Sequence, residues 1–262
     1  MLGEKMGLCG SNGSLWAWGY NHFGQLGLGD TAEVHTPTQA GTDHDWWSIS
    51  GFNDHSLGLK GDSSLWSWGH NHYYQLGFYN DNQPKWQPTH VGTDTDWRAI
   101  ATGTNYSFAV KNDGTLWGWG RNDQGQLGLG NNDSYHPVPE PVGTGSTWQA
   151  VACGDAHTIA QRTDGTLRGW GFNYDGELGV GTNTFYYASA QTIPSGVGSA
   201  SIALGSNSSA SLRTDGSLWS WGRNWEGNLG LGDTEEHTVP VEVVCQVTTV
   251  VREETLTGPN AF

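Results

Sequence analysis

The chain has 262 residues, among them 40 glycines and 15 tryptophans, and only 14 % of its residues are charged. Because so many large aromatic side chains can supply a hydrophobic core, this composition excludes a disordered linker. The 26 acidic and 11 basic side chains give a net charge of −15, which excludes the clustered basic surface that binds nucleic acid or an anionic membrane.

The chain opens on residues 1–6, which lack the apolar core of a signal peptide, and no later run approaches the roughly 18 apolar residues of a membrane span. Residues 6–9 match residues 108–111 and are expected to form the second strand of a repeat unit, so the chain begins inside a repeat. The sequence indicates no compartment.

A repeat follows, and its first core covers residues 15–30. Residues 15–19 read Leu-Trp-Ala-Trp-Gly and residues 24–27 read Gly-Gln-Leu-Gly. The Trp-Gly pair begins again at Trp68, Trp119, Trp170 and Trp221, in steps of 50, 51, 51 and 51 residues. The other cores cover residues 65–80, 116–131, 167–182 and 218–233. Such a constant period predicts one structural module per repeat.

Short strands are predicted within each module. In the fourth module these are residues 148–154, 157–160 and 167–170, with a two-residue turn at Asp164-Gly165. The turn recurs at Asn12-Gly13, Asp113-Gly114 and Asp215-Gly216, and the second copy departs with Gly61-Asp62. The stretch after each Gly-Gln-Leu-Gly motif is polar and contains prolines such as Pro37, Pro84 and Pro137, so we expect a connecting loop or an edge strand there. No segment shows helical periodicity.

The pattern Leu-Trp-x-Trp is apolar at successive positions, so both faces of each small sheet must be buried. Sheets stacked around an axis achieve this, and we predict an all-β propeller with five blades of about 51 residues. We expect a single domain over residues 1–251 and a C-terminal tail over 252–262. Residues 243–251 are strand-like and are expected to pair with the opening strand, so that the termini complete one blade. A fragment of a longer gene is the alternative.

Three cysteines are too few for a disulfide framework. Cys153 lies in an apolar stretch and is expected to fill the core. If the termini pair, Cys9 and Cys245 lie on neighbouring strands, where either a disulfide or two free thiols would fit.

The repeat Asp-Gly-Thr-Leu-Trp-x-Trp-Gly-Arg-Asn-x-x-Gly-Gln-Leu-Gly resembles the regulator-of-chromosome-condensation repeat in its tryptophan-rich, bacterial form. The resemblance extends from about Met6 to Val244. It implies a β-propeller. Because members of this family are mostly seven-bladed, five units imply either a five-bladed ring or part of a longer one.

Side chains between the recurring motif residues vary freely, and equivalent positions should lie on one face of the propeller. Aromatic and arginine side chains there are the types that anchor protein interfaces. We predict a binding face made of Tyr20, His22, Phe23, His70, His72, Tyr73, Arg121, Asp123, Phe172, Tyr174, Arg223 and Trp225. Gln124, Asp175 and Glu226 follow at the positions equivalent to Phe23 and Tyr73.

No catalytic motif and no cofactor or metal site is predicted. His35, His136 and His237 are equivalent positions and could surround the axis, but in a wide ring they would be too far apart to share one ion. The pair His70 and His72 lacks a third ligand, and the Asp-x-Asp pairs at 43–45 and 94–96 fall short of a calcium loop.

These features predict a non-catalytic scaffold that binds a protein partner. The resemblance also implies nucleotide exchange on a small GTPase, although the constant repeat length leaves no room for the inserted hairpin that exchange uses. Light sensing, as in a plant ultraviolet-B receptor that is similar to this family, would need Gly-Trp-Arg-His-Thr segments. Residues 154–158 read Gly-Asp-Ala-His-Thr instead. Glycan binding stays open, because exposed aromatic rings also stack on sugars.

Overall fold

The computed structural model describes residues 6–145, 147–194 and 198–244. These residues form nineteen strands in five antiparallel sheets. None of the described residues forms a helix with the length and hydrophobicity required to span a bilayer.

The first sheet contains three strands within the described residues, β1 (Met6–Ser11), β2 (Ser14–Gly19) and β3 (Val34–Gln39). The other four sheets each contain four strands in chain order. They are β4 (Trp46–Phe52), β5 (His55–Lys60), β6 (Leu65–Gly69) and β7 (Lys85–His90); β8 (Trp97–Gly103), β9 (Tyr106–Lys111), β10 (Leu116–Arg121) and β11 (Tyr135–Pro141); β12 (Trp148–Cys153), β13 (His157–Arg162), β14 (Leu167–Phe172) and β15 (Tyr186–Thr192); and β16 (Ser199–Leu204), β17 (Ser208–Arg213), β18 (Leu218–Gly222) and β19 (His237–Glu242).

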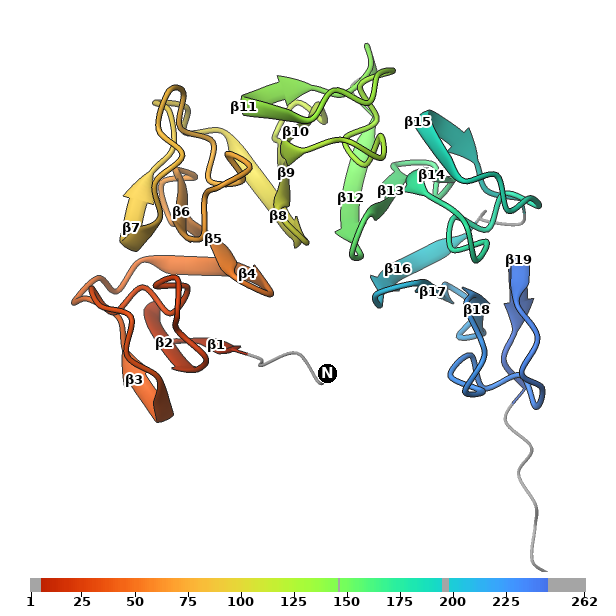
Figure 1. Cartoon of the computed structure of the whole chain (residues 1–262), viewed down its shortest axis with the longest axis horizontal. Coiled ribbons are helices and arrows are strands. Elements are labelled where there is room, and N and C mark those ends of the chain that lie inside the picture. Colours follow the sequence, from red (N-terminus) through yellow and green to blue (C-terminus); the bar gives the residue numbers. More distant parts are fainter. Residues whose placement is uncertain (1–5, 146, 195–197, 245–262) are drawn as a thin grey trace, which may run out of the picture.

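Figure 1 shows the sheets side by side in an arc around a common centre. Strands β4, β8, β12 and β16 lie innermost, and β3, β7, β11, β15 and β19 lie at the periphery. The predicted all-β propeller with repeat-sized blades is confirmed. The proline-bearing stretches are the outermost edge strands. We call the sheets the first to the fifth blade in chain order.

Neighbouring blades are joined through one backbone carbonyl in each Gly-Gln-Leu-Gly motif. The Gln25 carbonyl accepts the Trp68 indole N–H at 2.8 Å and the Ser56 hydroxyl at 2.9 Å. The same arrangement joins Trp119 and Ser107 to Gln75, Trp170 and Thr158 to Gln126, and Trp221 and Ser209 to Glu177. These four tryptophans are fully buried. The Trp of each of these Trp-Gly pairs therefore fills a junction between blades and donates a hydrogen bond across it.

The glycine of the Trp-Gly pair is required because another segment of the backbone passes very close to it. Gly120 has a φ of 96°, and a Cβ atom there would lie 2.7 Å from the Asn105 carbonyl oxygen. Both the left-handed backbone and the neighbouring chain exclude a side chain at this position. This explains why the pair recurs in every module.

The Asp-Gly turns differ in part from the prediction. Asn12 and Gly13 both have positive φ, 53° and 77°, and form the expected two-residue turn. At Asp113-Gly114 the Gly114 N–H donates to the Lys111 carbonyl and the Lys111 N–H to the Thr115 carbonyl, so the loop contains the three residues 112–114. Loops 163–165 and 214–216 have the same hydrogen bonds.

The two-residue prediction is therefore wrong for these three turns. The Asp113 carboxylate accepts the Thr115 N–H at 2.9 Å, and this local bond holds the aspartate in an ordinary backbone conformation. Only Gly114 then adopts positive φ, 82°. This is the arrangement of a three-residue hairpin with a glycine bulge.

The predicted closing strand cannot be compared in full. Val243 and Val244 lie after β19 and outside any strand, and residues 245–251 lie outside the described residues. The same holds for Cys245, so its pairing with Cys9 stays a prediction. Cys153 is a buried free thiol in an apolar cluster with Trp148 and Trp170, as expected, and burial raises its pKa.

Candidate functional site

A buried asparagine holds the loop that follows the third strand of each blade. In the third blade Asn122 accepts the Leu127 N–H through Oδ1 at 3.0 Å and donates through Nδ2 to Asn131 Oδ1 at 2.8 Å. The equivalent residues Asn21, Asn71, Asn173 and Asn224 are also fully buried and accept the corresponding leucine N–H. The recurring asparagine is therefore structural, because it satisfies backbone groups that the loop would otherwise leave unpaired.

The variable residues before and after this asparagine lie against each other in all five blades. Ring centroids are 6.1 Å apart for Tyr20 and His22, 6.3 Å for His70 and His72, and 6.4 Å for Phe172 and Tyr174. Arg121 forms an ion pair with Asp123 at 2.7 Å, and the Arg223 guanidinium carbon lies 3.9 Å from the Trp225 ring centroid. The second residue of each pair is exposed.

We call the surface formed by these five pairs, together with Phe23 and Tyr73, the loop face. It contains every residue that the sequence predicts for binding. Within each blade the contacts join positions that neighbour each other along the chain, as Tyr20 and His22 do.

Two further contacts connect the first three blades. The ring centroids of Phe23 and His70 are 4.4 Å apart. The Arg121 guanidinium carbon lies 5.7 Å from the centroid of the Tyr73 ring. Within the blades, His22 contacts Phe23 at 5.3 Å and His72 contacts Tyr73 at 5.1 Å. A continuous ribbon of aromatic, histidine and arginine side chains therefore extends from Tyr20 to Asp123.

The fourth blade carries an exposed aromatic cluster that includes a residue missed by the sequence analysis. Phe185 is 55 % exposed and lies 5.2 Å from Phe172 and 6.4 Å from Tyr174, which is 58 % exposed. Tyr186 follows at 6.1 Å. The run Phe-Tyr-Tyr at 185–187 is the sequence signal that could have indicated this cluster.

Trp225 of the fifth blade is 55 % exposed and is held in place from two sides. Arg223 covers its ring, and its indole N–H donates to the Glu236 carboxylate at 2.7 Å. An ordered, half-exposed indole loses little conformational freedom on contact with a partner, so it is suited to anchor one.

Burial shifts the pKa of two ionisable groups at the loop face, His70 and Asp54. Burial lowers the pKa of His70, although Asn105 and Asp54 oppose this shift. Burial raises the pKa of Asp54, and His70 and His22 oppose that shift. Below the ribbon, His55 is fully buried against the Ser107 hydroxyl, and burial lowers its pKa to about 3.

The histidines considered for a metal lie far from the axis. His35, His136 and His237 belong to the outermost strands β3, β11 and β19, and so they do not surround the centre of the propeller. His136 contacts Glu140 at 2.9 Å, and His237 contacts Asp233 at 3.2 Å. Within the described residues, no three His, Cys, Asp or Glu side chains come together in a way that could hold a metal ion.

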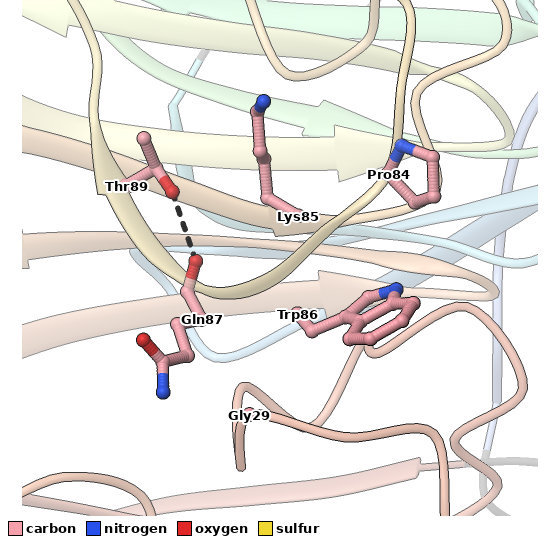
Figure 2. Close-up of a pocket in the computed structure, with 6 residues that line it drawn as sticks. All are labelled: Gly29, Pro84, Lys85, Trp86, Gln87 and Thr89. Atoms are coloured by element: carbon pink, nitrogen blue, oxygen red, sulfur yellow. Dashed lines mark hydrogen bonds between the residues drawn. The ribbon is translucent and has the colours of Figure 1, made fainter.

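A shallow groove of about 530 Å³ lies between the first two blades, along the peripheral strand β7. Figure 2 shows its lining residues Gly29, Pro84, Lys85, Trp86, Gln87 and Thr89. The Gly29 N–H donates to the Trp86 carbonyl at 2.9 Å, so the groove follows the line along which β7 joins the loop of the first blade. Lys85 is already paired with Asp81 at 2.6 Å. The groove contains no group of side chains arranged for catalysis.

Residues 3–255 match the family model described as RCC1-like domain. The chain is 33 % identical over 230 residues to the ultraviolet-B receptor of Arabidopsis thaliana, which covers 86 % of this chain and 52 % of the receptor. It is 34 % identical over 160 residues to a Protein RCC2 homolog of Xenopus laevis, covering 58 % of this chain and 31 % of that protein. The chain thus spans about half of the receptor and less of the other relative.

Solved structures confirm the fold. Human WBSCR16 matches with a TM-score of 0.81 and 25 % identity, over 91 % of this chain and 65 % of that one. Prp20p from Saccharomyces cerevisiae matches with a TM-score of 0.83 and 22 % identity, over 93 % of this chain and 62 % of that one, and its structure was described together with its binding to Gsp1p and histones.

Proposed function

Because the chain belongs to the RCC1-like domain family, we propose that it is a non-catalytic scaffold that binds a protein partner through the loop face. The observation that carries this proposal is the ribbon from Tyr20 to Asp123, which joins three blades through side chains alone. The loop backbones are held by the buried asparagines and the glutamine motif, and His70 adds to this hold, with Nδ1 2.9 Å from Gln75 Nε2. The exposed members of the ribbon, such as His72 and Asp123, accept no backbone N–H of these loops and are suited to contact a partner.

The exposed aromatic side chains of the fourth and fifth blades support the same role. Tyr174, Phe185 and Trp225 are each more than half exposed, and all lie in or beside the loops after the third strands. Interface anchors are enriched in such aromatic residues and in arginine. A relative of the same fold, Prp20p, is described as binding the proteins Gsp1p and histones, which supports a protein as the class of partner.

The test is affinity capture with the full chain and a triple variant, His72→Ala, Tyr174→Ala and Trp225→Ala. Each side chain is exposed, so the fold should be retained, and we expect the variant to lose a specific partner by at least about tenfold in affinity, since an interface anchor contributes roughly 2 kcal/mol or more. The matched control is Trp47→Ala with Trp86→Ala, which removes indoles that are 53 % and 50 % exposed outside the loop face.

A partner that both variants capture equally well would contradict the proposal. A partner that disappears after enzymatic deglycosylation of the lysate would instead indicate glycan recognition. Accelerated release of guanine nucleotide from a captured small GTPase would indicate exchange activity.

A further inference from the structure

The loops that meet where the fourth and fifth blades join carry an excess of negative charge. Residues 172–185 and 223–236 contain a single cationic residue, Arg223, and six carboxylates, those of Asp175, Glu177, Glu226, Asp233, Glu235 and Glu236. Within the described residues, the ion pairs that lysines and arginines form all lie between residues 43 and 123. Arg223 covers the Trp225 ring instead, with its guanidinium carbon 3.9 Å from the ring centroid.

Glu177 replaces a glutamine whose amide group crosses to the next blade at the first two junctions. Gln25 Nε2 donates to Asp54 Oδ1 at 3.3 Å, and Gln75 Nε2 donates to Asn105 Oδ1 at 2.9 Å. Glu177 has no such hydrogen to donate, and its Oε1 is buried without a partner among the described residues. A buried carboxylate oxygen that nothing satisfies is costly, and such groups are concentrated at functional sites.

Two more carboxylates act on Glu177, one from its own loop and one from the fifth blade. Asp175 is 3 % exposed; its Oδ2 accepts the Asn207 amide at 2.9 Å, and its Oδ1 has no partner within the described part of the chain. Glu236 is exposed and accepts the Trp225 indole N–H at 2.7 Å. Burial raises the pKa of Glu177 to about 7, and Asp175 and Glu236 add to the shift. The three carboxylates therefore repel one another across the junction.

The chemistry of the junction selects the kind of cation that could relieve this repulsion. Among the described residues no three acidic or histidine side chains are grouped to hold a metal ion. An ammonium or guanidinium group needs no fixed set of ligands, binds carboxylates and packs on an indole. Trp225 is 55 % exposed beside Glu236. Tyr174, its equivalent in the fourth blade, is 58 % exposed although the fifth blade follows it, so exposure at this position is a property of the loop.

We propose that this junction binds a lysine or arginine side chain of the protein partner beside Trp225 and Glu236, in front of the buried Glu177. This inference rests on the proposed function, and it names the chemistry of the segment that meets the loop face, which is basic. The net charge of −15 attracts such a segment from a distance, and the carboxylates at the junction fix where its cation binds. A bound cation offsets the buried negative charge that the free chain leaves unpaired.

The test is a titration of the full chain with a fluorescein-labelled octa-arginine peptide at pH 8, measured by fluorescence anisotropy. Glu177→Gln with Glu236→Gln keeps a hydrogen-bond acceptor at both positions and removes two charges, so we expect about tenfold weaker binding. The matched control is Asp113→Asn with Asp164→Asn, which removes two exposed carboxylates from the turns at the other end of the blades. It should change the affinity less than about twofold.

The pH dependence of binding separates Glu177 from a general attraction between opposite charges. A cation favours the ionised carboxylate, so the affinity of the unmodified chain should rise several-fold more between pH 6 and pH 8 than that of Glu177→Gln alone. The comparison is made between these two proteins because the histidines of the loop face titrate in both. An identical pH dependence would contradict a role for Glu177.

Equal losses for the two double variants, or no loss for either, would overturn the proposal. Thermal unfolding of each variant shows that the blades remain folded. The partner captured through the loop face distinguishes the two hypotheses. If His72→Ala, Tyr174→Ala and Trp225→Ala together release that partner while Glu177→Gln with Glu236→Gln retains it fully, the proposed function stands and the basic contact is wrong. Retention by the triple variant contradicts the proposed function itself.

Discussion

Glu177 occupies the position at which the three preceding repeats have glutamine, namely Gln25, Gln75 and Gln126. Its Oε2 accepts the Asp175 N–H at 2.9 Å, while Oε1 is buried and has no hydrogen-bond partner within the described residues. Burial raises the pKa of Glu177 to about 7, and the nearby Asp175 and Glu236 add to the shift. A neutral amide at the same position avoids the burial of this charge.

We predict that Glu177→Gln stabilises the protein above pH 7 by about 3 kcal/mol, because a pKa raised from 4.5 to about 7 corresponds to about 1.4 kcal/mol per pKa unit. The unfolded carboxyl ionises above about 4.5 and the folded one above about 7. Between these values the folded state holds the extra proton, so the wild-type protein loses stability as pH rises through this window. The gain should therefore shrink as pH falls toward 4.5 and be absent below it.

Urea unfolding at a series of pH values measures this difference. Glu226→Gln removes an exposed carboxylate from the equivalent loop of the fifth blade; it is the matched control and should change the unfolding free energy little. A stabilisation by Glu177→Gln that did not vary with pH would contradict the assignment.

At the level of elements, the loop after each third strand is the unit that presents the candidate binding residues. Its backbone is organised by a side chain rather than by a ladder of strand hydrogen bonds. In the third blade Asn122 alone accepts the Leu127 N–H and holds Asn131 at the far end of the loop. Substitution of this buried asparagine should therefore destabilise the loop more than substitution of any exposed side chain that the loop carries.

We predict that Asn122→Ala lowers the unfolding free energy by about 1–3 kcal/mol, because it leaves a buried backbone N–H without an acceptor. The exposed Asn132→Ala, a few residues farther along the same loop, should cost less than about 0.5 kcal/mol. Chemical denaturation of both variants provides the comparison. Equal losses for the two asparagines would show that the buried residue does not hold the loop.

For the whole molecule, stability depends on contacts between consecutive blades. Each junction buries one indole and satisfies its N–H on the preceding blade, as Trp119 does on the Gln75 carbonyl at 2.8 Å. Trp18 of the first blade is only half-buried, because no described residue lies before that blade to cover it. The ends of the arc and its interior therefore differ in burial although their sequences are nearly the same.

We predict that Trp119→Ala lowers the unfolding free energy by about 3–5 kcal/mol, the usual cost of emptying a large aromatic site. Trp86→Ala removes an indole that is 50 % exposed and should cost less than about 1 kcal/mol. Denaturant unfolding measures both values. Similar losses for the two indoles would contradict the central role of the junction tryptophans.

The repeat pattern in the sequence determined the number of sheets, their first three strands and the burial of the four Trp-Gly indoles at the junctions. These features arise from local patterns of apolar residues and glycine that every copy shares, such as Trp119-Gly120. The place of the twelve candidate residues in the loops after the third strands also followed from the sequence, because they alternate there with constant motif residues; their role in binding stays a prediction. The length of the Asp-Gly turns was not predicted correctly from the sequence. It depends on whether the aspartate side chain accepts a nearby backbone N–H, as Asp113 accepts that of Thr115.

Only the tertiary structure decided which variable side chains meet. The contacts of Phe23 with His70 and of Tyr73 with Arg121 depend on the rotation between successive blades, and that rotation is not encoded in any single repeat. The same reason explains why Leu218 is exposed and Leu116 is buried. Their local sequences agree, and the difference is whether a neighbouring blade lies against them.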